Sequence, residues 1–156
     1  MGVLRWLDSI LAPRSGATPS VTLDGITVSS KAEAKIANYF YQRGIRFEYE
    51  PTVRGGIFGL GKKISRPDFY LPQYGVYVEY WGLTNDPEYV KSMRWKMYQY
   101  RKHGLRFISL YPENLNNLDW IFRKKLEKAT GVSLGPSLKQ PHETSQNTSP
   151  HNVRIV

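Results

Sequence analysis

The 156-residue chain contains no cysteine, so it can form neither disulfide bonds nor thiolate metal sites. Histidine is scarce: His103, His142 and His151 share no ligand spacing, and zinc is not expected. No stretch approaches the roughly 18 apolar residues of a membrane span. Acidic residues are outnumbered, with 13 Asp and Glu against 22 Lys and Arg, a net charge of +9. This surplus favours a polyanionic partner, because neutralised phosphates release condensed counterions, although an acidic membrane surface would also fit.

The two ends of the chain differ from its middle. Residues 1–13, MGVLRWLDSILAP, space their apolar side chains as an amphipathic helix does. We expect this helix to dock on a partner or on the protein itself, with an interfacial membrane anchor as the alternative. The sequence therefore predicts an N-terminal helix and linker (1–28), one domain (29–130) and a disordered polar tail (131–156). A charged apolar run without a cleavage site does not resemble a secretory signal, and a cytoplasmic location is expected.

Periodicity and turn residues predict the order of elements in the domain. Ser30 and Glu33 form a capping box, and a proline at position 87 suits the first turn of a later helix. The predicted elements are a helix (31–43), three strands (45–50, 64–71 and 76–81), a helix (86–103), a strand (105–111) and a helix (112–129). The packing face of the last helix is predicted to include or border Leu115, Leu118, Trp120, Ile121 and Leu126. An α/β domain with a central mixed sheet flanked by helices follows, since three strands joined by tight turns form an antiparallel meander and the fourth can return by a right-handed crossover.

Two acidic residues occupy predicted strands, where an unpartnered carboxylate is costly. Asp68 follows a proline, and Glu79 lies within VYVEYW among β-branched and aromatic residues. A tight turn separates their strands, so the two carboxylates can be neighbours and offer hard oxygen ligands for Mg²⁺ or Mn²⁺. The alternative is an exposed sheet edge at which both side chains face water.

The pattern of Glu33 on the first helix, Arg66-Pro67-Asp68-Phe69, and Val78-Glu79-Tyr80 resembles the PD-(D/E)XK nuclease superfamily. It is most similar to small nuclease modules that are appended to superfamily-one DNA helicases or stand alone. The resemblance covers about residues 29–127 and includes the element order. It implies a restriction-endonuclease-like core, a divalent cation, and hydrolysis of DNA to 5′-phosphate and 3′-hydroxyl ends.

The resemblance also implies roles by position. Asp68 and Glu79 would bind the cation directly, and Glu33 would reach the same site, through water; alternatively Glu33 only completes the capping box. Glu50 at the end of a predicted strand is a secondary candidate that could orient the site, with a surface role as the alternative. A helicase becomes a possible partner of the N-terminal helix, beside self-association, and nucleoid association is expected if the source is bacterial.

One position departs from the superfamily pattern. The lysine expected two residues after Glu79 is replaced by Trp81. Lys96 borders the apolar stripe of the following helix, whereas Lys91 points to the opposite side. We therefore expect Lys96 to replace the missing lysine, either positioning the attacking water or stabilising transition-state charge. The alternative is that Lys96 extends to solvent.

Residues 54–66 predict a basic hairpin that contacts nucleic-acid backbone through Arg54, Lys62, Lys63 and Arg66. The stretch GIFGLGKK within it differs at one position from the phosphate-binding loop motif, because Lys63 stands where Ser or Thr binds Mg²⁺. No helix is predicted to follow it, so we do not expect a nucleotide-binding loop. Stacking of Trp81, Trp95, Tyr98 and Tyr100 on unpaired bases competes with a core role for each ring.

The sequence therefore predicts a Mg²⁺- or Mn²⁺-dependent deoxyribonuclease that acts in DNA repair, recombination or defence. Two alternatives remain open. One is a non-catalytic nucleic-acid-binding module of the same fold, which the loss of the motif lysine at Trp81 would favour. The other is an RNA-directed nuclease, which shares the chemistry and differs in substrate.

Overall fold

The computed structural model describes residues 18–55 and 61–135, and within them the chain forms an α/β fold. The predicted N-terminal helix, the centre of the glycine-rich turn, and the predicted tail beyond residue 135 lie outside the described residues. The elements are β1 (Ser20–Val21), β2 (Thr27–Val28), α2 (Lys31–Gln42), β3 (Glu48–Tyr49), β4 (Val53–Arg54), β5 (Lys63–Ser65), β6 (Phe69–Leu71), β7 (Val76–Tyr80), α3 (Pro87–Lys102), β8 (Phe107–Leu110), the 3₁₀ helix η2 (Pro112–Asn117) and α4 (Leu118–Thr130).

The central sheet has four strands in the order β3-β6-β7-β8. β3 pairs with β6 and β6 with β7 in antiparallel fashion, whereas β8 lies parallel to β7. The mixed sheet, its antiparallel meander and the return of the fourth strand beside the third are therefore confirmed. Two short hairpins, β1-β2 and β4-β5, lie outside this sheet.

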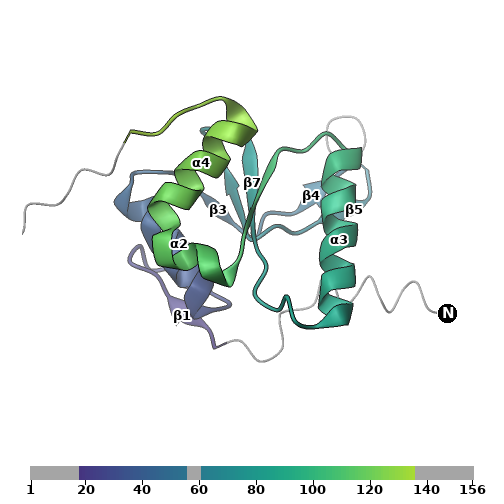
Figure 1. The fold of residues 1–156 in the computed structure, drawn as a ribbon, viewed down its shortest axis with the longest axis horizontal. Helices are drawn as coiled ribbons and strands as arrows, with labels where there is room; N and C mark the ends of the chain where they lie inside the picture. The colour runs from purple at the N-terminus through teal and green to yellow at the C-terminus, as the bar shows by residue number, and fades with distance from the viewer. Residues whose placement is uncertain (1–17, 56–60, 136–156) are drawn as a thin grey trace, which may run out of the picture.

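Helices flank the sheet on both faces (Figure 1). Side chains alternate along β7: Val78 belongs to the buried core with α2 and α4, whereas Tyr77 and Glu79 contact α3. Aromatic rings fill the α2–α4 side, where Phe40 meets Phe69 at 5.5 Å and Phe122 at 5.2 Å between ring centroids. The strand alternation thus places Glu79 on the face opposite the main core.

The caps explain where α2 and α3 begin. The Ser30 side chain accepts the Glu33 amide at the start of α2, as predicted, and the Glu33 carboxylate reaches back to the Ser29 amide and the Ser30 hydroxyl. The Asp86 side chain accepts the amides of Glu88 and Tyr89, with Pro87 in the first turn of α3. Both starts follow from local sequence chemistry and agree with the prediction.

Three predicted elements need correction. The strand 64–71 is two strands, because the chain breaks at Pro67 and β5 pairs with β4 while β6 joins the central sheet. The strand 45–50 shortens to β3, and the helix 112–129 begins as the 3₁₀ helix η2. Trp120 is 52% exposed, so its predicted place at the packing face is wrong.

Candidate active site

Asp68 and Glu79 lie side by side at the ends of two neighbouring strands. β6 and β7 pair in the register Phe69↔Val78, and continuing this register by one residue sets Asp68 opposite Glu79. Asp68 Oδ2 accepts a hydrogen bond of 2.6 Å from the amide of Tyr80, which ties it to the strand that carries Glu79. Both carboxylates are buried, so the alternative of two acids on a water-facing sheet edge is wrong.

Two donors from α3 hold one oxygen of the Glu79 carboxylate. Glu79 Oε1 lies 2.6 Å from Lys96 Nζ and accepts a hydrogen bond from the Tyr100 hydroxyl. Burial, followed by the charge of Glu79, raises the pKa of Tyr100, so the phenol keeps its proton and donates it to Glu79. The Ser65 hydroxyl, 2.8 Å away, then donates to Tyr100. The chain of donors fixes the orientation of Glu79.

The other oxygen of Glu79, Oε2, is buried and has no hydrogen-bond partner within the described part of the chain. Burial raises the pKa of Glu79 from 4.5 to about 7, and the neighbouring charge of Asp68 acts in the same direction. Lys96 opposes this rise but does not cancel it. An unsatisfied carboxylate oxygen beside a second carboxylate is what a hard cation would stabilise.

Lys96 reaches the carboxylates from the helix. Its side chain is 8% exposed, and its ammonium also donates to the Arg66 carbonyl at 2.8 Å. The alternative in which Lys96 extends to solvent is therefore wrong. The ammonium lies 5.6 Å from the centre of the Trp81 ring, within the range of a cation–π contact. Trp81, at the position of the missing lysine, is buried beneath the lysine that comes from α3, and its Nε1 has no hydrogen-bond partner among the described residues.

Glu50 and Arg66 form an ion pair at the edge of this cluster, with 3.0 Å between Arg66 Nη2 and Glu50 Oε2. The Glu50 amide donates to the Asp68 carbonyl at 2.9 Å, and Glu50 has φ of 48°, a left-handed conformation that is uncommon outside glycine. Glu50 is thus joined to Asp68 through the backbone, while its carboxylate engages a residue predicted to contact nucleic acid.

Glu33 is buried, and its carboxylate belongs to a hydrogen-bond network at the start of α2. It accepts from the Ser29 amide at 3.2 Å, the Ser30 hydroxyl at 3.0 Å and the Tyr49 hydroxyl at 2.7 Å. Among the described residues, no group of three or more His, Asp or Glu side chains is placed to hold a metal ion. The capping role of Glu33 is confirmed, and its metal role stays a prediction.

The other residues predicted to contact nucleic acid differ in how exposed they are. Arg54, Lys62 and Lys63 are exposed on β4, β5 and the turn before β5. Of the four aromatic candidates for base stacking, Trp81 and Tyr100 are buried and Tyr98 is 56% exposed. The sequence interpretation assigned no site role to Ser65 and treated Tyr100 as either a core or a base-stacking residue. The spacing of four residues between Lys96 and Tyr100 was the available signal, because it sets both on one face of a helix.

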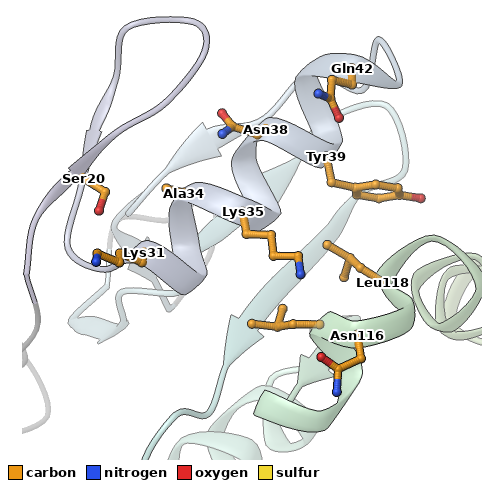
Figure 2. Close-up of a pocket in the computed structure, with 10 residues that line it drawn as sticks. Ser20, Lys31, Ala34, Lys35, Asn38, Tyr39, Gln42, Asn116 and Leu118 are labelled. Atoms are coloured by element: carbon orange, nitrogen blue, oxygen red, sulfur yellow. The ribbon is translucent and has the colours of Figure 1, made fainter. Parts of the chain in front are cut away.

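A hollow that is separate from this cluster lies between α2 and η2 (Figure 2). It has a volume of about 600 Å³, and Lys35 reaches into it from α2 toward Leu118. Its lining includes Lys31, Lys35 and Asn116 and none of the residues around Glu79. The exposed Lys31 and Lys35 of α2 therefore belong to a different surface from the carboxylate pair.

In the described part of the chain, no helix is long and apolar enough to cross a membrane. Comparisons of the chain with protein-family models, curated proteins and solved structures find no match. The chemistry open to the site therefore follows from its own residues.

Proposed function

We propose that the protein is a divalent-metal-dependent nuclease that hydrolyses phosphodiester bonds in DNA, with a PD-(D/E)XK-type site on a restriction-endonuclease-like core. The observation that supports this most is the gathering of Asp68, Glu79 and Lys96 in one buried cluster from two strands and a helix. Two carboxylates and an ammonium at the same place are the groups that this chemistry needs.

The residues present fit a divalent cation. Glu79 Oε2 is an orphaned buried acceptor, and Asp68 lies opposite it across the strand pair. The donor set is oxygen, which suits Mg²⁺ or Mn²⁺ better than softer metals. When bound, such a cation would supply Lewis acidity toward the scissile phosphate and an attacking water. Glu33 would act through water, because three donors already occupy its carboxylate.

The protein's own groups have distinct tasks in this proposal. Asp68 and Glu79 hold the cation, and the Tyr80 amide keeps Asp68 in place. Lys96 neutralises Glu79 and presents a positive charge beside the site, where it can orient the water or stabilise charge on the phosphoryl group. Tyr100 and Ser65 orient Glu79 and do not touch the substrate.

The test is cleavage of labelled single-stranded, duplex and branched DNA with Mg²⁺, Mn²⁺ or EDTA. We expect metal-dependent cutting that Asp68→Asn lowers about 100-fold or more, since the amide keeps the hydrogen bond from Tyr80 but loses the charge. Lys96→Met should reduce cutting similarly, whereas Lys35→Met on the exposed face of α2 should leave it unchanged. Thermal unfolding of each variant separates lost chemistry from lost folding.

Two outcomes would favour the alternatives. Salt-dependent binding without cutting under every metal condition would indicate a non-catalytic nucleic-acid-binding module. Faster cutting of RNA than of DNA with the same sequences would indicate an RNA-directed nuclease that uses the same residues. Cutting that persists in Asp68→Asn would contradict the assignment of the site itself.

A further inference from the structure

The outward face of α3 carries an uninterrupted set of cations around one aromatic ring. After the first turn of the helix, every exposed residue belongs to this set, which we call the α3 basic stripe: Lys91, Arg94, Tyr98, Arg101 and Lys102. At 3.6 residues per turn these positions fall within about 100° of arc, roughly opposite the buried Lys96 and Tyr100. The inner face of the helix therefore serves the carboxylate site, and its outer face is exposed among the described residues.

The charges of the stripe are not neutralised within the described part of the chain. Lys91, Arg94 and Lys102 form no ion pair or hydrogen bond with another described side chain, and Arg101 lies over the Phe107 ring at 5.9 Å. By contrast, Arg43, Arg66, Arg123 and Lys124 each pair with an acid. A row of uncompensated cations repels itself, and a polyanion relieves that repulsion.

The stripe continues onto the β4-β5 hairpin. Gly55 at the base of this hairpin lies against the end of α3, where a Cβ on residue 55 would be 3.6 Å from His103 Cε1. Figure 1 shows β4 and β5 beside α3. The exposed Lys62 and Lys63 therefore lie toward the C-terminal end of the stripe, and the two surfaces can follow one strand of phosphates.

Tyr98 is the aromatic residue of the stripe. It is 56% exposed in the middle of the stripe, with cations before and after it on the helix. In a duplex the base faces are covered by their neighbours, whereas an unpaired strand offers each face for stacking. An acidic polypeptide would satisfy the cations but would give the ring no flat partner.

We propose that the α3 basic stripe binds an unpaired nucleic-acid strand, with Tyr98 stacking on a base and Lys91, Arg94, Arg101 and Lys102 contacting phosphates. The inference deepens the proposed nuclease function by naming the strand state of the substrate next to the site. Binding does not need the metal, so it can be measured without cleavage.

The experiment measures fluorescence anisotropy of labelled oligodeoxythymidine, oligouridine and a DNA duplex of equal length with the full chain in EDTA. Tyr98→Ala should weaken binding of the single strands at least about fivefold and leave duplex binding within about twofold. Tyr41→Ala is the matched control, because Tyr41 is 55% exposed on α2 and should have no effect.

Charge is tested by the salt dependence of binding. The double variant Lys91→Gln/Arg94→Gln should reduce the slope of log affinity against log salt by about 1.4, or about 0.7 for each lost contact to a single strand. The matched control is Lys31→Gln/Lys35→Gln, which removes two exposed lysines from α2 and should leave the slope unchanged. Loss in both pairs to the same extent would overturn the localisation to α3.

Further outcomes would support or overturn the binding of a single strand by the α3 basic stripe. Tyr98→Ala that behaves like Tyr41→Ala, or polyglutamate that displaces the oligonucleotide as well as unlabelled strand does, would overturn the proposal. Equal binding of DNA and RNA single strands would support it, since stacking does not read the sugar. If the stripe binds single strands but no metal supports cutting, the nuclease proposal fails and the inference stands; if cutting occurs without a Tyr98 effect on binding, the inference alone fails.

Discussion

Glu79 has two carboxylate oxygens in very different environments. Oε1 receives the ammonium of Lys96 and the hydroxyl of Tyr100, whereas Oε2 receives no hydrogen bond within the described residues. A buried group that served only the fold would be expected to have both oxygens satisfied. The asymmetry supports the proposed metal site, in which Lys96 and Tyr100 hold Oε1 and Oε2 would bind the cation.

Stability of the metal-free protein should depend on the protonation of Glu79. Burial raises the pKa of Glu79 from 4.5 to about 7, so between these values the folded protein holds a proton that the unfolded chain releases. This contribution is present below pH 4.5 and is lost as pH rises through about 7, by about 3 kcal/mol in the unfolding free energy. Urea unfolding in EDTA across this window measures it. Glu79→Gln should lack the decrease, and identical slopes for the variant and the wild type would contradict the assignment.

Removing one hydroxyl should test the support of Glu79. Tyr100→Phe keeps the ring that stacks on Tyr77 but deletes the donor to Glu79 and the acceptor for Ser65. We expect a loss of about 1–2 kcal/mol in unfolding free energy and slower metal-dependent cleavage. Tyr98→Phe, two residues earlier on the same helix, should change stability by less than about 0.5 kcal/mol. Equal losses of unfolding free energy in Tyr100→Phe and Tyr98→Phe would show that the buried hydrogen bonds of Tyr100 do not stabilise the protein by this amount.

The sequence predicted some members of this buried cluster and missed others. Asp68 and Glu79 were predictable because a carboxylate inside an apolar strand needs an explanation. Lys96 was predictable from its phase on the helix, beside the apolar stripe. Tyr100 was not assigned a role at the site, because a tyrosine on a helix's apolar face looks the same whether its hydroxyl meets solvent or a buried acid. Its partner Ser65 comes from a different strand, which only the tertiary fold reveals.

At the scale of the elements, α2 and α3 are packed very differently. α2 buries Glu33, Ala34, Ile36, Ala37 and Phe40, whereas α3, though longer, buries only Lys96 and Tyr100 among its 16 residues. Most of the stability of a helix in a protein comes from packing of its apolar face. α3 therefore depends more on its caps and on polar contacts than α2 does.

Hydrogen exchange should detect this difference. Amides of α3 should exchange faster than those of α2, and Asp86→Ala should widen the gap, because the side chain caps the amides of Glu88 and Tyr89. Loss of a cap costs about 1 kcal/mol, so α3 amides should exchange about fivefold faster in the variant while α2 amides stay unchanged. Uniform acceleration in both helices would instead mean that they open only together.

Helix starts were more predictable than strand ends. Ser30, Asp86 and Pro87 identify their positions through local hydrogen bonds and a fixed φ, and both helices begin there. Residues 64–71 were predicted as one strand, although the missing amide of Pro67 ends the ladder and sends β5 to a different partner. β4 was missed because two residues of strand carry no periodicity.

At the scale of the whole molecule, one core joins α2, the sheet and α4. Phe122 is fully buried against Phe40 and Tyr39, whereas Trp120, two residues earlier, is 52% exposed. Phe122→Ala should lower the unfolding free energy by about 3–5 kcal/mol. Trp120→Ala should cost less than about 1 kcal/mol. Chemical denaturation of both variants checks the arrangement, and a larger cost for Trp120 would place α4 on its other face.

The class of fold followed from the order of elements, and the sheet's neighbours followed from turn lengths. Which residues of each helix face the core was harder to predict than the order of the elements. Trp120 was placed at or near the packing face because it is a large aromatic residue among the apolar side chains of this helix. At 3.6 residues per turn it lies about 200° from Leu118 and about 120° from Leu126 around the helix, so the face that α4 buries turns Trp120 outward.

The buried pair of Glu79 and Lys96 has a consequence for engineering. Well-packed apolar residues in place of a buried ion pair often leave a protein equally stable or more stable. A designer who ranked substitutions by thermal resistance alone would therefore be led to replace this pair. The more stable protein so obtained would have lost the groups to which we assign the proposed cleavage, so optimisation of this chain should hold positions 68, 79, 96 and 100 fixed from the start.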